Sequence, residues 1–446
     1  MNSATHSDTP RGRALVILRR AEEGVFADAL LDEARAVFDA RDSALLLELV
    51  YGVLRNRTLL DSWLNQLSAR PLDRTDAWTR NILRLGAYQL LFLDRIPPSA
   101  AVNTAVELAK TRGRKQGYIN GLLRNLDRKR SELAKPGQDD PVRRLSVLFS
   151  HPAWLVRRWV ARYGVDAAEK ILAKNNEPAP LVIRANRLRT SRERLRSALR
   201  AEGVESRETA YAPDGLELGP CGRMRALAAY QEGLFMVQDE AAQLISLMLA
   251  PAPGAAVLDA CAAPGGKATH IAELMSNRGA VTALENDPVR IGKISENSSR
   301  LGTTIVAPVP GDARAYQGGP FDHLLIDAPC TGLGVLRRHP DGRWSRNEEH
   351  IRERAAVQRA ILAHCAGLLQ PGGSLVYATC TTEPEENEEI IDAFLEGQGA
   401  NFRIDDPRPY LPEKASEFVD TRGFLRTHRN NNGMDGFFGA RLLKKG

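Results

Sequence analysis

The sequence is poor in cysteine and contains no long apolar run. Five cysteines occur in 446 residues, and they form no CxxC pair and no Cys/His cluster at zinc spacing. Neither a disulfide framework nor a structural zinc site is therefore expected. No stretch approaches the roughly 20 apolar residues of a membrane helix, and the polar start MNSATHSDTPRGRALVILRR has no signal-peptide core. We expect a soluble cytoplasmic protein that holds no metal.

Two common glycine motifs are also missing. The chain has neither the GxGxxG fingerprint of dinucleotide-binding folds nor the GxxxxGK[ST] phosphate loop, which argues against hydride transfer and nucleotide hydrolysis. A chain of this length has room for two or three domains with a sizeable core. Its formal net charge is +6, which is compatible with a polyanionic partner.

Residues 14–130 are predicted to be helical throughout, because apolar residues recur at helical spacing in 44–54 and again in LLDSWLNQL and ILRLGAYQLLFL. The stretch 110–130 carries eight basic residues, one acid (Asp127) and an aromatic, Tyr118. Such a stretch is typical of a solvated helix face, but it also suits RNA phosphates. At this point both interpretations stand.

A linker is predicted at KPGQDDP (135–141), where Pro, Gly and paired acids separate two periodic segments. Beyond it, LVIRANRL alternates like a strand, SRERLRSALRAEGV reads as a helix with a serine cap, and ESRETA reads as a second strand. We therefore predict a first domain at 1–135 and a small α/β module at 142–235.

From residue 236 to 446, apolar strands alternate with helices. The predicted strands are AAVLDA, AVTALE, TIVAPVP, DHLLIDA and GSLVYAT. This alternation predicts a mainly parallel, doubly wound sheet that binds its ligand at the carboxyl ends of the strands.

A cofactor site is predicted at those strand ends. VLDACAAPGGKATHIAEL has a strand, a Pro/Gly turn and a helix, and Gly265 and Gly266 allow the backbone to approach a ligand. Three acids, Asp259, Glu285 and Asp312, follow three successive strands. Glu285 is placed to accept ribose hydroxyls and Asp312 to reach an adenine edge. An adenosyl ligand without phosphate, S-adenosylmethionine, fits this pattern best.

Two cysteines follow the next two strands. Cys330 comes after Asp327, and Cys380 comes directly after a strand, so both thiols should lie at the cofactor edge of the sheet. A thiol beside a methyl sulfonium suits methylation of a pyrimidine, because carbon 5 of cytosine becomes nucleophilic only after a thiolate adds to carbon 6. Asp327 is placed to hold the edge of the ring at nitrogen 3. The two cysteines can then divide addition and release. The other three, Cys221, Cys261 and Cys365, read as structural.

The motifs DACAAPGGK, LEND, GDAR, DAPC, RRHPDGRW, TCTTEPEEN and DGFFGARL, in this order, resemble those of the RNA cytosine-5 methyltransferases. RRHPDGRW, with RIPPSAAVNTAVELAK and YINGLLRNL near the N-terminus, is similar to one bacterial branch, the RsmB (Sun/Fmu) family. That family acts on small-subunit ribosomal RNA, and its N-terminal domain is related to the RNA-binding factor NusB. The resemblance covers nearly the whole chain. It implies an all-α NusB-like bundle, a ferredoxin-like α/β module and a Rossmann-like class I methyltransferase domain.

The resemblance also assigns roles to residues. Cys380 would be the nucleophile, and Cys330 would assist breakdown of the adduct. Cofactor contacts would come from Cys261, Ala262, Ala263, Pro264, Gly265, Gly266, Lys267, Glu285, Asp312 and Asp327. The backbone of Cys261 thereby gains a binding role. Glu285 departs from the family's usual Asp by one methylene, and Thr381 stands where Ser is common.

With the resemblance, the basic stretch reads as RNA-facing, through Arg112, Arg114 and Lys115. Arg337, Arg338 and His339 are expected to shape an RNA groove, and His339 is not expected to bind a metal. The predicted enzyme is a monomer that binds small-subunit ribosomal RNA, and neither DNA nor a membrane. Two alternatives stay open: a transfer RNA cytosine-5 methyltransferase, and a NusB-like RNA-binding factor without activity. A DNA methyltransferase would use the cysteine after proline as nucleophile and leave Cys380 idle.

Overall fold

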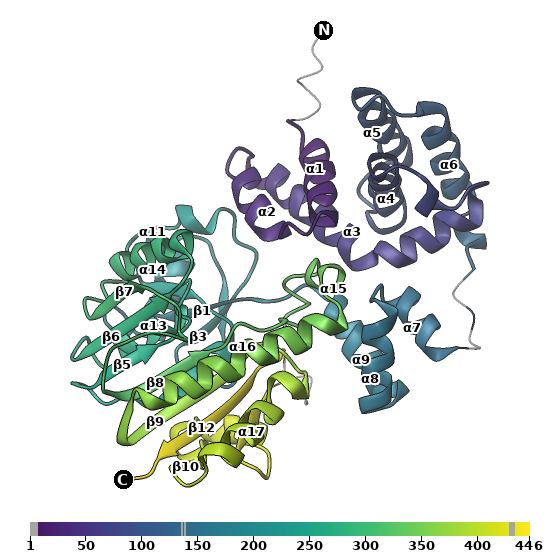
Figure 1. The fold of residues 1–446 in the computed structure, drawn as a ribbon. Helices are drawn as coiled ribbons and strands as arrows, with labels where there is room; N and C mark the ends of the chain where they lie inside the picture. The colour runs from purple at the N-terminus through teal and green to yellow at the C-terminus, as the bar shows by residue number, and fades with distance from the viewer. Residues whose placement is uncertain (1–7, 135–136, 138–139, 428–432) are drawn as a thin grey trace. The chain divides into compact units, whose positions relative to one another are not determined.

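The computed structural model describes residues 8–134, 137, 140–427 and 433–446. The chain divides into two compact units (Figure 1). The first unit comprises residues up to 178 together with 336–348, and the second comprises 179–335 and 349–446. Most of the predicted linker at 135–141 lies outside the described residues. No helix in the described ranges is long and apolar enough to cross a membrane.

The first unit is helical, and its residues 14–130 are the part that the sequence predicted to be a helical bundle. Its helices are α1 (Pro10–Glu22), α2 (Ala27–Arg35), α3 (Ala40–Leu67), α4 (Ala77–Phe92), α5 (Pro98–Thr111), α6 (Gln116–Arg128), α7 (Pro141–Leu148), α8 (Ala153–Tyr163), α9 (Val165–Asn176) and the short α15 (Gly342–Ser345). Thr9, Asp39 and Asp76 cap α1, α3 and α4, each accepting a hydrogen bond from a backbone N–H of the first turn. The periodic residues of α3, including Leu46 and Leu49, are fully buried.

The segment 336–348 packs within the first unit, although the residues before and after it in the chain belong to the second unit. The guanidinium of Arg343 is fully buried there and donates to the carbonyls of Ser150 (3.1 Å) and Asn175 (3.1 Å) and to Oδ1 of Asn176 (2.7 Å). Trp344 donates to Leu54 O (2.9 Å). Residues about 200 positions apart thus form one core, which no local pattern in the sequence indicated.

A small antiparallel sheet opens the second unit, in the strand order β2-β3-β1-β4. It comprises β1 (Leu181–Ala185), α10 (Arg192–Ala201), β2 (Ser206–Glu208), β3 (Gly215–Leu218), α11 (Ala228–Gln231) and β4 (Phe235–Val237). Ser191 caps α10 by accepting from the backbone N–H of Arg194, as predicted. This sheet lies within the predicted α/β module at 142–235, whereas α7, α8 and α9, which that prediction included, belong to the first unit.

The large sheet has the strand order β10-β12-β9-β8-β5-β6-β7. Its elements are α12 (Glu240–Leu249), β5 (Ala256–Asp259), α13 (Gly266–Leu274), β6 (Ala280–Glu285), α14 (Pro288–Leu301), β7 (Val306–Pro310), β8 (Phe321–Asp327), α16 (Glu348–Gly367), β9 (Leu369–Thr379), α17 (Glu388–Gln398), β10 (Phe402–Ile404), β11 (Phe424–Arg426) and β12 (Phe438–Lys444). Strands β5 to β9 pair in parallel, as predicted. Strands β10, β11 and β12 add antiparallel pairings that the sequence did not predict.

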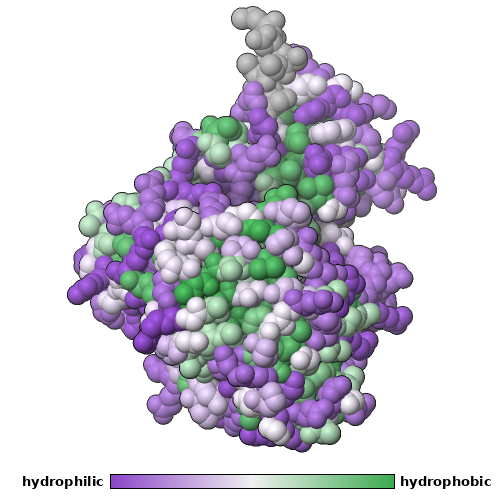
Figure 2. All heavy atoms as spheres, turned by 60° about the vertical axis from the view of Figure 1, so that its left-hand side comes forward, coloured by the Kyte–Doolittle hydropathy of each residue, from purple (hydrophilic) through white to green (hydrophobic). Residues whose placement is uncertain are grey.

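Helices cover both faces of this sheet. Alternate residues of β8 face opposite ways: Leu325 packs in the core with α12 and α13, whereas Leu324 and Ile326 pack with α16 and α17. Figure 1 shows α16 lying across strands β8 and β9. Because helices cover both faces, the sheet is doubly wound, which leaves its ligand site at the carboxyl ends of the parallel strands. On the face drawn in Figure 2, apolar side chains gather in patches among hydrophilic ones.

Candidate active site

The predicted site residues of the second unit meet at one edge of the large sheet. Asp259 and Glu285 end β5 and β6, and Asp327 ends β8. Cys380 follows β9 directly. Because β5, β6, β8 and β9 are parallel, their carboxyl ends lie at the same edge. The sequence placed these residues correctly because the direction of each strand follows from the strand–helix alternation.

The glycine turn between β5 and α13 forms a cradle. Gly265 has a φ of 95°, a conformation that favours glycine, and a Cβ there would lie 3.3 Å from Cα of Ile294. The N–H of Gly265 closes the turn on Ala262 O at 2.7 Å. Residues 261–267 thus bring the backbone to the N-terminus of α13, where N–H groups point outward.

A buried arginine from the small sheet supports this turn. Arg184, on β1, donates to Gly266 O (2.8 Å) and pairs with Glu273 of α13 (2.6 Å), and both side chains are fully buried. The guanidinium also donates to Gln238. Sequence reasoning missed Arg184 because β1 and α13 are about 80 residues apart and neither shows a pattern that pairs them.

Asp259 is a buried acid without a partner. Its side chain is fully buried, and neither carboxylate oxygen has a partner at ordinary hydrogen-bonding geometry within the described residues. Burial, reinforced by the charge of Asp327, raises the pKa of Asp259 to about 7. A buried polar group left unpaired is costly, so this carboxylate suits a ligand that brings a donor, such as the amino group of S-adenosylmethionine.

Glu285 and Asp312 lie further along the same edge. Glu285 is buried and accepts from the backbone N–H groups of Asn286 (3.0 Å) and Asp287 (3.1 Å), which fixes its carboxylate. Asp312 is half-buried, and the hydrogen bonds of Arg314 lower its pKa. Both carboxylates can accept hydroxyl or amine donors. The described residues contain no group of three or more His, Cys, Asp and Glu side chains placed to hold a metal ion.

Lys267 and Asp327 form a partly buried ion pair beside the thiols. Nζ of Lys267 donates to Oδ2 of Asp327 at 2.7 Å and lies 5.2 Å from the ring centroid of Phe437. Burial favours the neutral amine, but the charge and hydrogen bond of Asp327, together with the charge of Asp259, outweigh it and raise the pKa of Lys267. The ion pair therefore holds the Asp327 carboxylate in a fixed direction at the end of β8.

The two cysteines are in contact. Sγ of Cys330 and Sγ of Cys380 lie 3.3 Å apart and share a hydrogen bond. This hydrogen bond and burial raise the pKa of the Cys330 thiol well above its usual range. Cys330 is therefore held as a neutral thiol at neutral pH. Such a thiol can donate to the sulfur of Cys380.

A buried network fixes both cysteine loops. Thr331 and Thr381, the residues after the two cysteines, bond through their hydroxyls at 3.0 Å. Glu386 accepts from the N–H of Thr331 (2.8 Å) and from Nε2 of Gln358 (3.1 Å). All of these side chains are buried. Sequence reasoning included Glu386 in a motif but gave it no role. It missed Gln358, although a polar residue on the buried side of α16 is a signal that could have found it.

Gly334 allows the two cysteine loops to lie this close. Its N–H donates to Cys380 O at 3.0 Å, and its carbonyl accepts from the N–H of Gly436 at 2.8 Å. A Cβ on Gly334 would lie 2.0 Å from Gly436 O, so no larger residue fits. The loop after Cys330 is thus packed against the backbone of Cys380.

The predicted RNA-binding residues all belong to the first unit. Arg112 lies over the ring of Trp78 (4.4 Å), Arg114 pairs with Asp76 (3.4 Å), and Lys115 is exposed. Arg112, Arg114 and Lys115 lie in the connection between α5 and α6. The other three predicted residues lie in the 336–348 segment.

Within that segment, Arg337 donates to Pro178 O at 2.8 Å and His339 pairs with Asp28. Arg338 is half-buried beside them. These contacts join the segment to the helices of the first unit. A groove for RNA at these residues stays a prediction.

Three family models match the chain. A model described as "16S rRNA methyltransferase RsmB/F" matches residues 246–443, the NusB family model matches 9–128, and a "Methyltr_RsmF/B-like, ferredoxin-like domain" matches 151–222. Together they cover both units. The chain is thus similar to this family in its N-terminal helices, its small sheet and its large sheet.

Curated proteins match over nearly the full length. The chain is 39% identical to the "Probable ribosomal RNA small subunit methyltransferase B" of Bacillus subtilis, covering 91% of each chain. It is 36% identical to the "Ribosomal RNA small subunit methyltransferase B" of Escherichia coli (strain SMS-3-5 / SECEC), covering 95% of this chain and 96% of that protein.

Solved structures match as well. The crystal structure of PH0851 has a TM-score of 0.79 and 30% identity, covering 97% of this chain and 98% of that one. The structure of NSun6 from Pyrococcus horikoshii with SFG has a TM-score of 0.59 and 26% identity, covering 66% of this chain and 98% of that one. SFG is an analogue of S-adenosylmethionine, the ligand class that the acids and the glycine turn fit.

Proposed function

Because this chain belongs to the RsmB/F family of 16S rRNA methyltransferases, with S-adenosylmethionine as cofactor, we propose that it methylates carbon 5 of a cytosine. The substrate is small-subunit ribosomal RNA, and the reaction passes through a covalent adduct on Cys380. In this proposal the enzyme acts on RNA and not on DNA, and it acts as a monomer.

The contact between the two thiols carries this proposal. Cys330 and Cys380 meet at 3.3 Å beside the Lys267–Asp327 pair. A methyltransferase that acts on a nucleophilic nitrogen or oxygen has no use for a paired thiol at its cofactor edge. Carbon 5 of cytosine needs one, because it becomes nucleophilic only after an addition at carbon 6.

The proposed sequence of steps uses four side chains of the second unit. The thiolate of Cys380 forms a bond to carbon 6, and the electron pair of the ring's 5,6 double bond moves toward carbon 5. Asp327, held by Lys267 through Oδ2, faces nitrogen 3 and favours the addition by holding a proton there. The target base has to leave its stack to admit the thiol.

Release reverses the addition. S-adenosylmethionine, when bound, supplies the methyl group that carbon 5 takes. A base then removes the proton of carbon 5, the electron pair of that C–H bond restores the double bond, and the S–C6 bond breaks with its pair on Cys380. The neutral thiol of Cys330 donates to the departing sulfur, so that Cys380 leaves as a stabilised thiolate.

Residues at the strand ends fit the cofactor. The backbone of 261–267 would approach it closely, the carboxylate of Asp259 would accept from its amino group, and Glu285 would accept from its ribose hydroxyls. Asp312 accepts from its adenine amine. These residues would bind and orient the cofactor.

The function is tested with nucleoside analysis of defined RNA. We expect the protein with S-adenosylmethionine to form 5-methylcytidine in unmethylated 16S rRNA, measured by mass spectrometry after digestion. Protein-free transcript and partly assembled small subunits are assayed in parallel, because either form can expose the base. Transfer RNA transcripts are the control. Formation of 5-methylcytidine only in transfer RNA would reject the ribosomal substrate, and methylation at another atom would reject the cysteine chemistry.

The basic stretch of the first unit is expected to bind RNA. Changing Arg112, Arg114 and Lys115 together to Ala removes three cations between α5 and α6, so RNA affinity should fall. The slope of log K against log salt should become shallower by up to about 2.1 to 2.7, since each of three phosphate contacts contributes roughly 0.7 to 0.9. Filter binding across a salt series measures both. Arg19→Ala with Arg20→Ala on α1 is the control, and equal slopes for all variants would mean that the stretch is only a solvated face.

A further inference from the structure

Each reactive cysteine is held through the residues on either side of it in the chain. Cys380 lies between Thr379 and Thr381, and the side chain of Asn387 bonds to both. It accepts from the Thr379 hydroxyl at 2.5 Å and donates to Thr381 O at 3.0 Å. The side chains of Thr379, Thr381 and Asn387 are all buried. These two bonds fix the chain before and after the Cys380 thiol.

Glu386 holds Cys330 in the same manner. Its carboxylate accepts from the backbone N–H of Thr331 (2.8 Å) and from Nε2 of Gln358 (3.1 Å). The same nitrogen of Gln358 also donates to Pro329 O at 3.0 Å. The residues before and after Cys330 are therefore both tied to this carboxylate, one directly and the other through Gln358.

Asn387 stands at the N-cap position of α17 but does not cap the helix. An asparagine at this position ordinarily accepts from a backbone N–H of the first turn, and among the described residues the side chain of Asn387 makes no such bond. Its amide is directed to the Cys380 loop instead. Because Glu386 and Asn387 are adjacent, the start of α17 contacts the loops of both cysteines, whose sulfurs lie 3.3 Å apart.

We propose that Glu386 and Asn387 are positioning residues for the two thiols. Asn387 sets the direction of the Cys380 sulfur for addition to carbon 6, and Glu386 holds Cys330 where it donates to the departing sulfur. The proposal rests on the proposed function for these two steps. Displacing a reacting atom by about 1 Å can cost about 100-fold in rate, so loosening one cysteine should impair one step more than the other.

The thiol contact is tested first without RNA, on the full chain, with the oxidant diamide. Closure of a Cys330–Cys380 disulfide removes a proton and an electron from each thiol, forms the S–S bond and reduces the azo group of diamide to a hydrazine. The wild type should close this bond readily, as measured by mass spectrometry of non-reduced peptides. Asn387→Asp and Glu386→Gln should each close it at least about tenfold more slowly, because each substitution loosens one thiol.

Reaction with unmethylated 16S rRNA should then separate the two residues. Asn387→Asp loses the donor to Thr381 O, so its single-turnover rate of methyl transfer should fall about 100-fold without accumulation of a covalent adduct. Thr379→Val removes the hydroxyl that donates to Asn387 and is nearly isosteric. It should give the same result, and it provides a second route to the test if Asn387→Asp folds poorly.

Glu386→Gln should instead accumulate the protein–RNA adduct on a denaturing gel. The hydrogen bond with Cys380, burial and the charges of Cys380 and Glu386 raise the pKa of the Cys330 thiol, so the substitution removes one of the reasons for Cys330 to stay neutral. It also frees the loop that carries this thiol, and both changes impair donation to the departing sulfur. In all three variants the affinity for S-adenosylmethionine should stay unchanged.

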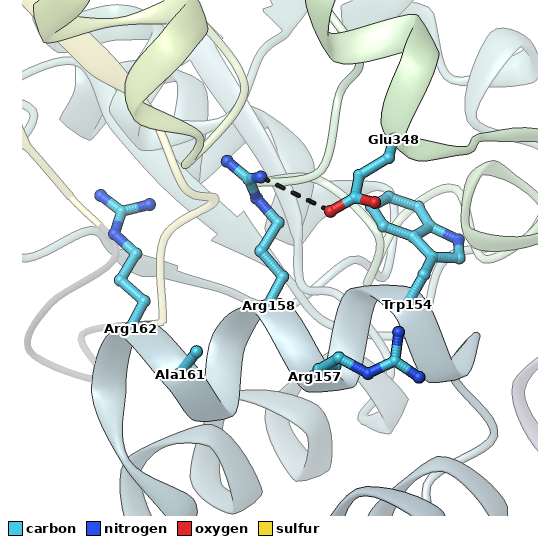
Figure 3. A pocket seen from close by; sticks show the side chains of 6 residues that line it. All are labelled: Trp154, Arg157, Arg158, Ala161, Arg162 and Glu348. Atoms are coloured by element: carbon cyan, nitrogen blue, oxygen red, sulfur yellow. Dashed lines mark ion pairs between the residues drawn. The ribbon is translucent and has the colours of Figure 1, made fainter.

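Two exposed positions serve as controls. Glu396→Gln makes the same chemical change at an exposed carboxylate of α17. Arg157→Ala changes an exposed side chain that lines a hollow on α8 of the first unit (Figure 3). Neither should alter the rate of disulfide closure. Wild-type closure and wild-type adduct levels in the site variants would overturn the proposal. Parallel loss of cofactor affinity and turnover would also overturn it, because the pair would then support the whole domain.

The two assays separate this proposal from the proposed function. If the wild type forms no 5-methylcytidine but the site variants still slow disulfide closure, the proposed function fails and the positioning of the thiols stands. If the wild type methylates 16S rRNA and the site variants close the disulfide and turn over normally, the positioning proposal alone fails.

Discussion

Cys330→Ala is expected to accumulate a covalent protein–RNA adduct, whereas Cys380→Ala is expected to form none. The substrate is unmethylated small-subunit ribosomal RNA with S-adenosylmethionine, and the adduct is detected as a shifted band on a denaturing gel. Methyl transfer by Cys380→Ala should fall by at least about 1000-fold, since removal of a catalytic nucleophile typically costs this much or more. Binding of S-adenosylmethionine should stay nearly unchanged.

The two thiols differ because their surroundings differ. The hydrogen bond with Cys380 and burial raise the pKa of Cys330, which disfavours its thiolate and suits it to donation. In Cys330→Ala the sulfur of Cys380 loses its partner at 3.3 Å, so addition still proceeds but the departing thiolate is no longer stabilised. The adduct should therefore persist.

Cys365→Ala is the matched control, because its buried sulfur bonds to Ala313 O (3.3 Å) and not to either reactive cysteine. It should form no lasting adduct and keep its activity. An adduct in Cys380→Ala that is absent in Cys330→Ala would reverse the roles, as in a DNA methyltransferase. Normal turnover by Cys380→Ala would remove this residue from the mechanism.

Arg343→Ala is expected to destabilise the first unit by about 3 to 5 kcal/mol. The substitution leaves a cavity where a fully buried side chain was. It also leaves the carbonyls of Ser150 and Asn175 and the side chain of Asn176 without their donor, and each buried acceptor left unpaired costs about 1 to 3 kcal/mol. Denaturant unfolding followed by circular dichroism measures the loss.

Arg337→Ala provides the comparison within the same segment. Arg337 is only half-buried, whereas Arg343 is fully buried, so the loss of the Arg337 side chain should cost less, about 1 kcal/mol. Equal unfolding midpoints for Arg343→Ala and the wild type would show that the 336–348 segment contributes nothing to the core of the first unit. Because that segment follows Cys330 by a few residues, the methyl-transfer rate of each variant is also informative.

Local sequence patterns predicted much of the second unit. The strands before Asp259, Glu285, Asp327 and Cys380 have apolar residues in short runs between helices, and the parallel sheet then brings their carboxyl ends to one edge. The meeting of Cys330 and Cys380 follows from this rule, since β8 and β9 are neighbours in the sheet. The antiparallel strand β12 was not predicted, because it lies between β10 and β9 and its pairing depends on the whole sheet rather than on a local pattern.

The sequence by itself determined the helical first unit, the parallel strands and the two thiols at their ends, because each depends on periodicity within a few residues. Only the tertiary structure decided where isolated polar residues go. Arg184 supports the glycine turn from another sheet, Glu386 joins the two cysteine loops, and Arg343 is buried among helices far from it in the chain. A buried polar side chain is stable only where the fold supplies its partners, and those partners come from elements that no local pattern connects.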